Sequence, residues 1–468
     1  MKNSNLSPLC VDLDGTLIAT DSLWESILVL LRQNFWLSFL LPIWLLKGKA
    51  YFKYKISQYS DLDIATLPYN EQVLDFLNLS KNRKLVLATA ANQKIAHAVA
   101  DHLQIFDEVI ASDEQINMIG VNKRDALKDK FGTYSYIGDS SADIPILKAA
   151  QEAYLVSPSH SLLTQCPAKK IFATPKPTLK TWIKSLRPHQ WVKNTLIFLP
   201  LILAHQILDI SKLADAMLAF LAFSLIASSG YVINDLLDLA ADRTHPTKKN
   251  RPFASGKLPI KFGLPIFVIL VSLGFFISLL WLNLNFTGML ALYLALTLAY
   301  SFYLKKKLVV DVIVLAGLYT HRILAGGLAV SVEVSSWLLA FSMFMFMSLA
   351  LLKRYVELHH LTSKKKVKNR GYEIGDICMI ASMGPTSGYL AVLVFSLYIS
   401  SDKVTTLYSS PFILWLTCPV LLYWITRIWF LANRKQMLDD PVQFALTDKI
   451  SWLVVVCTGI LISLATVI

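Results

Sequence analysis

The sequence predicts an α/β domain at the amino terminus followed by an all-α polytopic membrane domain. Three observations predict this division. Short apolar strands alternate with helical patterns before residue 156. Apolar runs of about 18 to 25 residues, long enough to cross a bilayer, dominate after residue 190. A stretch that contains Pro158, Pro167, Pro175 and Pro177 separates the two. The predicted boundaries are 1–156 for the α/β domain, 157–178 for a linker and 179–468 for the membrane domain.

The composition agrees with a membrane protein. The chain has 468 residues, of which 54% are hydrophobic, and a mean hydropathy of +0.50. The net charge of +13 comes mainly from Lys and Arg in short segments between apolar runs, which is the positive-inside pattern and not a nucleic-acid surface. The five cysteines have no metal-type spacing, and the amino terminus has no signal-peptide pattern. We therefore expect a protein of the bacterial inner membrane whose amino-terminal domain is cytoplasmic.

The α/β domain is predicted to contain strands at 8–13, 84–89, 108–112 and 134–139, with helices between them, as in a parallel sheet. Residues 22–80 are predicted to form a helical cap. Within the cap, "FWLSFLLPIWLL" (35–46) is too short to span a membrane and is interrupted by Pro42. We expect it to form the core of the cap, and contact with the membrane surface is the alternative.

The membrane domain is predicted to cross the bilayer nine times. With a cytoplasmic amino terminus, the loops that carry most Lys and Arg, such as 243–261, 305–307, 364–370 and 434–435, all face the cytoplasm. The predicted spans are 191–208, 213–233, 263–283, 286–303, 309–330, 336–353, 377–399, 411–431 and 450–467.

Two carboxylates follow the first predicted strand in the stretch "DLDGT". Asp12 and Asp14 are two residues apart, so their side chains point the same way at the end of the strand. One carboxylate can act as a nucleophile while the other gives and takes a proton. Thr89 follows a later strand, Lys123 follows further on, and Asp139 and Asp143 come after the strand that ends at 139.

These motifs resemble those of the haloacid dehalogenase-like phosphatases over residues 8–156. The resemblance implies that Asp12 is the nucleophile and Asp14 the general acid and base. It also implies that Thr89 and Lys123 hold the phosphate, with Lys128 and Lys130 as competitors of Lys123, and that Mg²⁺ binds Asp12, Asp139 and Asp143.

The membrane domain carries a second acidic motif in "NDLLDLAAD". Asp235, Asp238 and Asp242 are spaced by three and four residues and lie on one helical stripe. Like charges in that arrangement repel, so a divalent ion is the economical explanation, and Mg²⁺ prefers to bridge carboxylates to phosphates. Arg251 in the following loop suits the remaining phosphate charge.

This motif, beginning at Asn234 and followed by "RPFASG", resembles the UbiA superfamily of intramembrane prenyltransferases over residues 180–468. That superfamily carries a second motif, D-x-x-x-D, on a later helix. Here the comparable place has Asp311 but Leu315. One carboxylate cluster then holds one metal-diphosphate unit, and Arg322 or His321 replaces the charge of the second metal.

The variant is similar to one branch of the superfamily, the decaprenyl-phosphate phosphoribosyltransferases, in "LRPHQWVKNTLIFLPL", "SFYLKKKLVVDV", "THRILAGG" and "LLKRYVEL". The resemblance implies phosphoribosyl diphosphate as donor and a polyprenyl phosphate as membrane-lipid acceptor. The residues expected to bind substrate are Lys193, Asn234, Arg251, Asp311, Arg322, Lys353 and Arg354.

The sequence leaves two further functions open. One is the transfer of a prenyl group from a prenyl diphosphate to an aromatic or other acceptor. The other is a transporter or lipid-binding scaffold with a regulatory soluble domain. The hypothesis favoured by the sequence is a sequential pair, in which phosphoribosyl transfer is followed by removal of the 5-phosphate. The oligomeric state is left open.

Overall fold

The structure is a computed structural model that describes residues 6–174, 177–359, 371–401, 404, 407–437 and 440–467. The predicted basic loop at 364–370 lies outside the described residues. The chain divides into two compact units, Met1–Arg187 with Tyr231–Phe267, and Pro188–Gly230 with Val268–Ile468.

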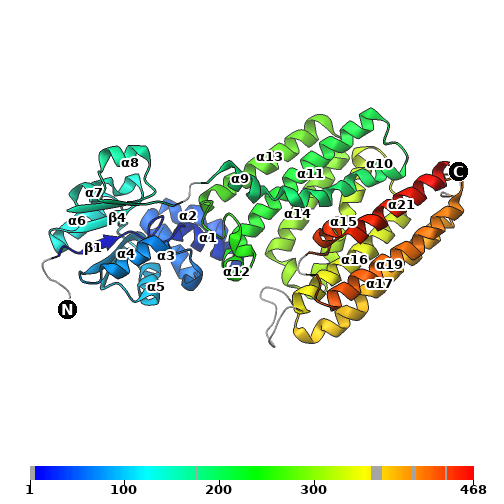
Figure 1. Cartoon of the computed structure of the whole chain (residues 1–468). Coiled ribbons are helices and arrows are strands. Elements are labelled where there is room, and N and C mark those ends of the chain that lie inside the picture. The colour runs from blue at the N-terminus through cyan, green and yellow to red at the C-terminus, as the bar shows by residue number, and fades with distance from the viewer. Residues whose placement is uncertain are drawn as a thin grey trace. The chain divides into compact units, whose positions relative to one another are not determined.

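The first unit is built on a six-stranded parallel sheet with the order β3-β2-β1-β4-β5-β6. Two of its strands, β1 and β4, are labelled in Figure 1. The strands are β1 (Leu9–Val11), β2 (Leu85–Asn92), β3 (Glu108–Ser112), β4 (Ser135–Gly138), β5 (Glu152–Val156) and β6 (Lys170–Phe172). The predicted α/β fold with a parallel sheet is confirmed. Because the central strands β1 and β4 are neighbours, the residues that follow them meet at the carboxyl edge of the sheet.

Helices connect these strands and pack on the sheet. They are α4 (Glu71–Leu79), α5 (Gln93–Leu103), α6 (Val121–Phe131), α7 (Ile144–Ala149) and α8 (His160–Gln165). Two apolar clusters fill the interior, one around Leu9, Val11 and Leu87, the other around Cys10, Val86 and Tyr136. Successive residues of β1 therefore enter opposite clusters, as the alternation of a strand buried on both faces requires.

The sheet continues beyond the predicted domain boundary at 156. Strand β6 pairs with β5 from Tyr154–Lys170 to Val156–Phe172, so residues 160–172 form α8 and β6 where the sequence predicts a linker. Pro158 and Pro167 lie on either side of α8. Proline marks turns as well as linkers, which explains the difference.

The cap consists of α1 (Ser22–Gln33), the 3₁₀ helix η1 (Phe35–Leu40), α2 (Leu41–Leu46), α3 (Lys49–Tyr59) and η2 (Ile64–Thr66). Its core contains Leu30, Trp44 and Ile56. The expectation that residues 35–46 form this core is wrong for most of the segment, because Trp36 is 80% exposed, Phe39 63% and Leu46 88%. Trp44 supplies the buried ring, and the other face of the segment lies at the surface.

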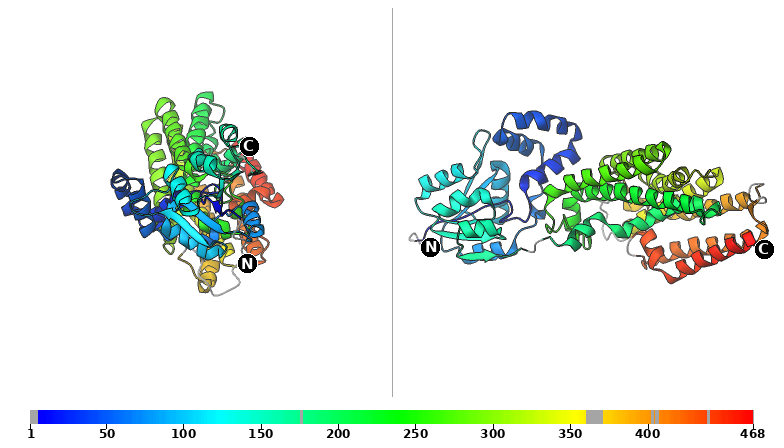
Figure 2. Two further views of the ribbon diagram at one scale, coloured as in Figure 1. Left: turned by 90° about the vertical axis from the view of Figure 1, so that its left-hand side faces the viewer. Right: turned by 90° about the horizontal axis from the view of Figure 1, so that it is seen from above.

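The second unit is a bundle whose long helices run side by side (Figures 1 and 2). Among the described residues, eight helices are long and apolar enough to cross a membrane. In the part of the chain after residue 178 that the structure describes, the helices are α9 (Leu179–Leu186), η4 (Pro188–Phe198), α10 (Leu199–Leu203), α11 (Ile210–Leu237), α12 (Leu239–Thr244), η5 (Lys248–Asn250), η6 (Ile260–Phe262), α13 (Gly263–Trp281), α14 (Leu284–Phe302), η7 (Leu304–Lys306), α15 (Val310–Ala329), α16 (Ser336–His359), η8 (Ile374–Asp376), α17 (Ile377–Ile399), η9 (Pro411–Leu416), α19 (Thr417–Asn433), α20 (Pro441–Thr447) and α21 (Lys449–Val467).

Eight of the nine predicted spans correspond to these long helices. The first predicted span, 191–208, is built differently, from η4 and the short helix α10. Pro200, at the start of α10, cannot donate a backbone hydrogen bond to the preceding turn, which interrupts a regular helix. Polar side chains of the segment also bond within the bundle, since Asn194 donates to Ser224 Oγ at 2.9 Å.

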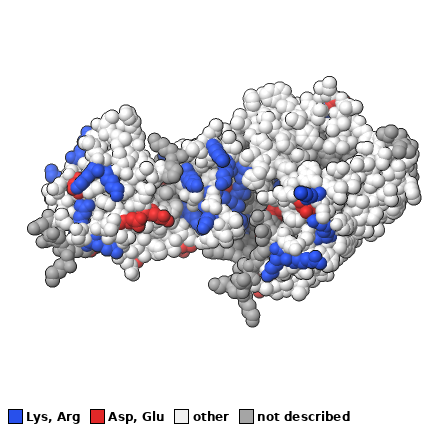
Figure 3. Space-filling view, viewed as in Figure 1, with Lys and Arg blue, Asp and Glu red and all other residues white. Residues whose placement is uncertain are grey.

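The outer surface of the bundle suits a hydrocarbon solvent. The span that contains α13 has an 18-residue stretch with a mean hydropathy of 2.5, and only 22% of that stretch is buried inside the protein. On the face drawn in Figure 3, the bundle presents large areas without Lys, Arg, Asp or Glu among the described residues. The eight apolar helices and this uncharged surface are those of an integral membrane protein.

Candidate active sites

The first candidate site lies where β1 ends. Asp12 is buried, and its Oδ1 accepts a hydrogen bond from the backbone N–H of Leu13 at 2.9 Å. Gly15 turns the chain with φ +74°, and a Cβ at this position would lie 2.2 Å from Asp139 Oδ2. Glycine is thus required both by the backbone conformation and by the close approach of the second carboxylate.

A buried lysine reaches the first carboxylate. Lys123 is 1% exposed. Its Nζ lies 3.1 Å from Asp12 Oδ1 and 3.5 Å from Asp143 Oδ1. The same ammonium group donates a hydrogen bond to Tyr136 Oη at 2.8 Å. Burial is the largest single influence on Lys123 and acts to lower its pKa. The opposite charges of Asp12 and Asp143 together outweigh burial, so the pKa of Lys123 is raised. Lys128 and Lys130 are exposed on the same helix. Lys123 is therefore the one of the three that the structure brings to the carboxylates.

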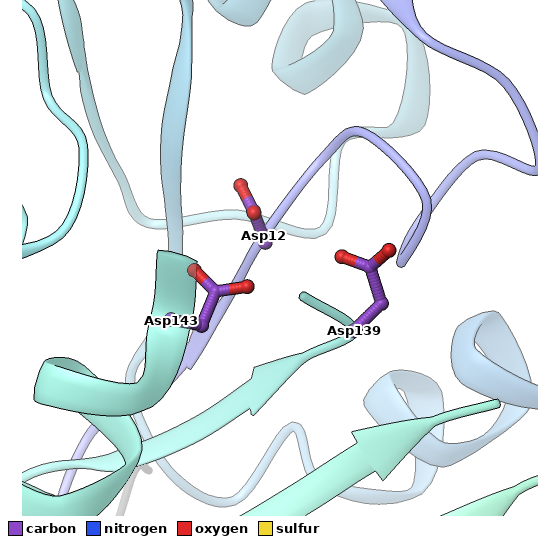
Figure 4. A group of neighbouring side chains, drawn as sticks. All are labelled: Asp12, Asp139 and Asp143. Atoms are coloured by element: carbon purple, nitrogen blue, oxygen red, sulfur yellow. The ribbon is translucent and has the colours of Figure 1, made fainter. Parts of the chain in front are cut away.

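Three carboxylates converge on one space at the end of β1 (Figure 4). Oxygen atoms of Asp12, Asp139 and Asp143 all lie within 4.8 Å of one another. Burial, together with the nearby charge of Asp143, raises the pKa of Asp12 to about 6. Burial also raises the pKa of Asp139 to about 7, with added contributions from the charges of Asp12 and Asp143. Oxygen ligands of this kind, crowded and sharing a buried space, fit a hard divalent cation such as Mg²⁺, which would favour their charged forms.

Asp14 is held by the first residue of the cap. Its two oxygens accept hydrogen bonds from Ser22, one from the backbone N–H at 2.7 Å and one from the hydroxyl at 3.0 Å. Burial, together with the neighbouring Asp21 and Asp12, raises the pKa of Asp14 to about 8. A carboxyl group with this pKa carries a proton at neutral pH and can donate it.

The remaining residues of this site are Thr89 and a lysine that the sequence analysis missed. Thr89 is fully buried, and its Oγ1 accepts a hydrogen bond from the N–H of Ala91 at 3.0 Å. Lys53 of α3 donates to the carbonyl of Ala90 at 2.6 Å, and together with Asp14 and Ser22 it lines a small cavity. Lys53 lies on an insert 30 or more residues from the motifs, so its position could not be read from their spacing.

The second acidic motif lies at the end of α11. Asp235 is buried, and Arg187 and Arg251 both form ion pairs with its Oδ1, Arg251 at 3.2 Å. Arg251 also pairs with Asp242 of α12. Asp238, half-buried, occupies the break between the two helices. Arg187 is a member of this cluster that the sequence analysis did not identify, because it precedes the motif by 48 residues.

The second motif is chemically suited to a metal. Among the described residues, Asp235, Asp238 and Asp242 do not form a group as compact as that of Asp12. However, Asp235 Oδ2 is buried and has no hydrogen-bond partner. A free, buried carboxylate oxygen next to two further carboxylates fits an oxygen-preferring cation, and the two arginines fit its anionic partner. Asn234 is half-buried beside Asp235. The roles predicted for these residues stay predictions.

Two residues expected to bind substrate pair with each other. Asp311 is fully buried, and Arg354 Nε lies 2.7 Å from its Oδ2. Tyr372 donates to Asp311 Oδ1 at 2.7 Å, and Arg354 also pairs with Glu357. The charges of Asp311 and Arg354 are thus neutralised inside the bundle. Removing one partner of such a pair typically costs about 3–5 kcal/mol of stability.

Arg322 is similarly engaged. It is 4% exposed and donates to Asn194 Oδ1 at 2.9 Å, to Tyr293 Oη at 2.9 Å and to the carbonyl of Leu318. Its guanidinium group also lies 5.0 Å from the centre of the Tyr293 ring. These contacts connect α14, α15 and η4, so Arg322 holds the bundle together at its interior.

Lys193 and Lys353 share a single carboxylate. Asp440 Oδ2 accepts hydrogen bonds from Lys193 Nζ at 3.1 Å and from Lys353 Nζ at 2.7 Å. Its Oδ1 caps α20 by accepting from the N–H of Val442 at 3.0 Å. The two lysines hold the pKa of Asp440 well below its usual range, although burial opposes them. Asp440 was not recognised from the sequence, since it is distant from both lysines along the chain.

Comparison with known proteins gives a family match for each domain. Residues 195–460 match the model of the UbiA prenyltransferase family. Residues 9–148 match the model of the haloacid dehalogenase-like hydrolases. Both resemblances noted from the sequence motifs are confirmed.

Two curated relatives extend the comparison. "Uncharacterized protein y4nM" of Sinorhizobium fredii is 37% identical over 459 residues, which cover 96% of this chain and 89% of the relative. Its coverage therefore includes both domains. A decaprenyl-phosphate phosphoribosyltransferase of Mycolicibacterium smegmatis is 37% identical over 190 residues, or 39% of this chain and 59% of the relative.

A solved structure resembles the membrane part. It is a UbiA homologue from Archaeoglobus fulgidus bound to DMAPP and Mg²⁺, with a TM-score of 0.47 and 16% sequence identity. The match covers 60% of this chain and 99% of the homologue.

Proposed function

The chain belongs to the UbiA prenyltransferase family and carries a haloacid dehalogenase-like hydrolase domain, and on this premise we propose that it makes a polyprenyl phosphoribose in two steps. The membrane domain transfers phosphoribose from phosphoribosyl diphosphate to a polyprenyl phosphate. The amino-terminal domain then hydrolyses the 5-phosphate of that product. The sequence identity of 36–37% with decaprenyl-phosphate phosphoribosyltransferases supports this choice of substrates.

The observation that carries the choice of donor is the engagement of Asp311. A second metal-binding motif needs free carboxylates, but Asp311 is tied to Arg354 and Tyr372, and position 315 is a leucine. The Asp235 cluster is then the carboxylate group left for a diphosphate. The superfamily that transfers prenyl groups carries a second motif of carboxylates, and the departure of this chain from that motif at position 315 favours phosphoribosyl transfer over prenyl transfer.

The transfer requires no nucleophilic side chain. A phosphate oxygen of the lipid forms a bond to C1 of the ribose while the C1–O bond to diphosphate breaks, and diphosphate leaves with the electron pair. Asp235, Asp238 and Asp242 would hold Mg²⁺, which when bound neutralises the leaving diphosphate. Arg187 and Arg251, which form ion pairs with Asp235, would then exchange these contacts for contacts with the diphosphate.

The hydrolysis proceeds through the carboxylates of the first site. Asp12 attacks the phosphorus of the 5-phosphate, and Asp14 gives its proton to the departing ribose oxygen. Water then attacks the phosphoryl group on Asp12 and gives a proton to Asp14, and orthophosphate leaves. Lys123 holds the phosphoryl oxygens, and Asp139 and Asp143 would hold Mg²⁺ with Asp12.

Both reactions are assigned to the cytoplasmic side of the inner membrane. Laid end to end, the two helices of residues 188–203 would have the length of a span, since eleven residues of 3₁₀ helix rise about 22 Å and five of α-helix about 7.5 Å. The sum of about 30 Å matches the hydrocarbon core. With that crossing included, the basic loop from Arg243 to Lys261 follows the second crossing and is cytoplasmic, in agreement with the positive-inside rule.

The first test of the proposed function is an analysis of products. Purified full-length protein is supplied with Mg²⁺, decaprenyl phosphate and ¹⁴C-labelled phosphoribosyl diphosphate. It is expected to yield ¹⁴C-labelled lipid and to release diphosphate and orthophosphate, which carry no label. Mass spectrometry of the lipid shows whether the attached ribose still carries its 5-phosphate. A parallel reaction with labelled prenyl diphosphate tests the rival. Label in lipid from the prenyl donor only would sink the proposal.

A second prediction concerns Asp440. Asp440→Asn is expected to lower the KM for decaprenyl phosphate about tenfold, because Lys193 and Lys353 are then no longer occupied by an internal carboxylate that the lipid phosphate must displace. Asparagine can still cap α20. The matched control is Asp448→Asn, since Asp448 caps the next helix but pairs with Arg427. A higher KM in Asp440→Asn would show that Asp440 positions the lysines for the lipid.

A further inference from the structure

The cap of the first unit carries an apolar ridge that its own core does not use. Trp36, Phe39, Ile43 and Leu46 are 80%, 63%, 51% and 88% exposed. They are spaced by three, four and three residues, which places them on one side of consecutive helical turns. We call these four residues the cap ridge.

The opposite side of the same segment is packed. Trp44 is 7% exposed and belongs to the cap core with Leu30 and Ile56, and Leu37 and Leu41 pack against that core. The segment therefore has apolar side chains on both sides, of which one side satisfies the cap. The ridge needs a second apolar environment, since an exposed row of large apolar residues is unusual on a free surface.

Charge indicates what that environment is. Residues 26–60 contain not one Asp or Glu. Lys47 and Lys49 are exposed directly after the ridge. Apolar and aromatic side chains next to lysines match a bilayer surface with anionic headgroups. The ridge is also too short to cross a membrane, and the chain is already anchored in one.

We propose that the cap ridge inserts into the headgroup region of the membrane and places the phosphatase domain on the lipid surface. The benefit of this membrane contact for hydrolysis rests on the proposed function. A phosphatase whose substrate is a lipid-linked sugar phosphate must reach a headgroup that stays at the bilayer. The cap also supplies Ser22 to Asp14 and Lys53 to the small cavity beside it, so a cap held at the surface lies close to its substrate.

The test uses a photo-crosslinking amino acid in the full-length protein. p-Benzoylphenylalanine is placed at position 36, and the protein is reconstituted in nanodiscs of phosphatidylcholine and phosphatidylglycerol. The matched control is position 79, because Leu79 lies in the same unit, is 85% exposed and is not part of the ridge. After illumination, position 36 is expected to give lipid adducts in mass spectrometry, and position 79 is expected to give few.

Two results would overturn the proposal. An absence of lipid adducts at position 36, or adducts there no more frequent than at position 79, would mean that the ridge makes no specific contact with the membrane. Crosslinks from position 36 to a second copy of the chain, in place of lipid, would mean that the ridge is a protein interface. Neither result depends on catalysis, so this proposal and the proposed function can fail separately.

A functional measurement adds a second readout. Phe39→Glu with Leu46→Glu is expected to raise the KM for the lipid-linked phosphate about tenfold, because the domain loses its local concentration of substrate. Hydrolysis of the water-soluble ribose 5-phosphate should keep its kcat and KM, which also reports that the variant is folded. Equal losses for both substrates would contradict a role at the membrane.

Discussion

Asp12→Asn is expected to release diphosphate at the wild-type rate while orthophosphate release falls by about 10³-fold or more, the order expected when a covalent nucleophile is removed. The amide can still accept the hydrogen bond from Leu13 N–H, so the loop after β1 should keep its shape. The lipid product should accumulate with its 5-phosphate, which mass spectrometry detects. Diphosphate and orthophosphate are measured in the same reaction, so transfer serves as an internal control for folding.

The matched control for this variant is Asp129→Asn. Asp129 lies on α6, six residues after Lys123, but is exposed, so both products should form at wild-type rates. Orthophosphate release that is unchanged in Asp12→Asn would remove the hydrolytic role of the amino-terminal domain. The transferase assignment would stand in that case, because it depends on different residues.

The opposite pattern is expected for Asp235→Asn. Diphosphate release should fall by about 100-fold or more, since the change removes a negative charge from the group that holds the metal-bound diphosphate. More Mg²⁺ should be needed for half-maximal rate. Hydrolysis of lipid-linked phosphoribose 5-phosphate added from outside should continue at the wild-type rate, because Asp12, Lys123 and Asp139 are untouched.

Asp209→Asn is the control for the membrane domain. Asp209 is an exposed residue just before the other end of α11, where it accepts from the N–H of Ser211 at 3.0 Å, a contact that asparagine can keep. It should transfer normally. If Asp235→Asn transferred phosphoribose at the wild-type rate and Mg²⁺ dependence, the assignment of the diphosphate to this motif would have to be abandoned.

The fold could be predicted well from the sequence where one solvent dominates. Eight long apolar runs correspond to eight long helices, and the predicted strand at 108–112 corresponds to β3. Failures occurred where a local signal has two meanings. Pro158 and Pro167 indicate turns around α8 as well as a linker, and an apolar segment such as 35–46 can face a core or a membrane with one composition.

The site was predicted as far as motifs reach. Asp12, Asp139 and Asp143 meet because parallel strands end at one edge, which periodicity can indicate. Arg187, Lys53 and Asp440 were missed because their partners are distant in sequence and their own neighbours carry no pattern. The pairing of Asp311 with Arg354 shows the converse, since a charge in an apolar span can be matched internally.

The backbone at Gly15 has a practical consequence for separating the two activities. Asp139 Oδ2 would lie 2.2 Å from any Cβ there, so even one methyl group must push a carboxylate away from its two companions. The hydrolase could thus be silenced by bulk alone, with every ionisable side chain retained. A chain altered in this way would keep its electrostatic field and lose only the spacing of its oxygens, which separates the contribution of charge from that of geometry.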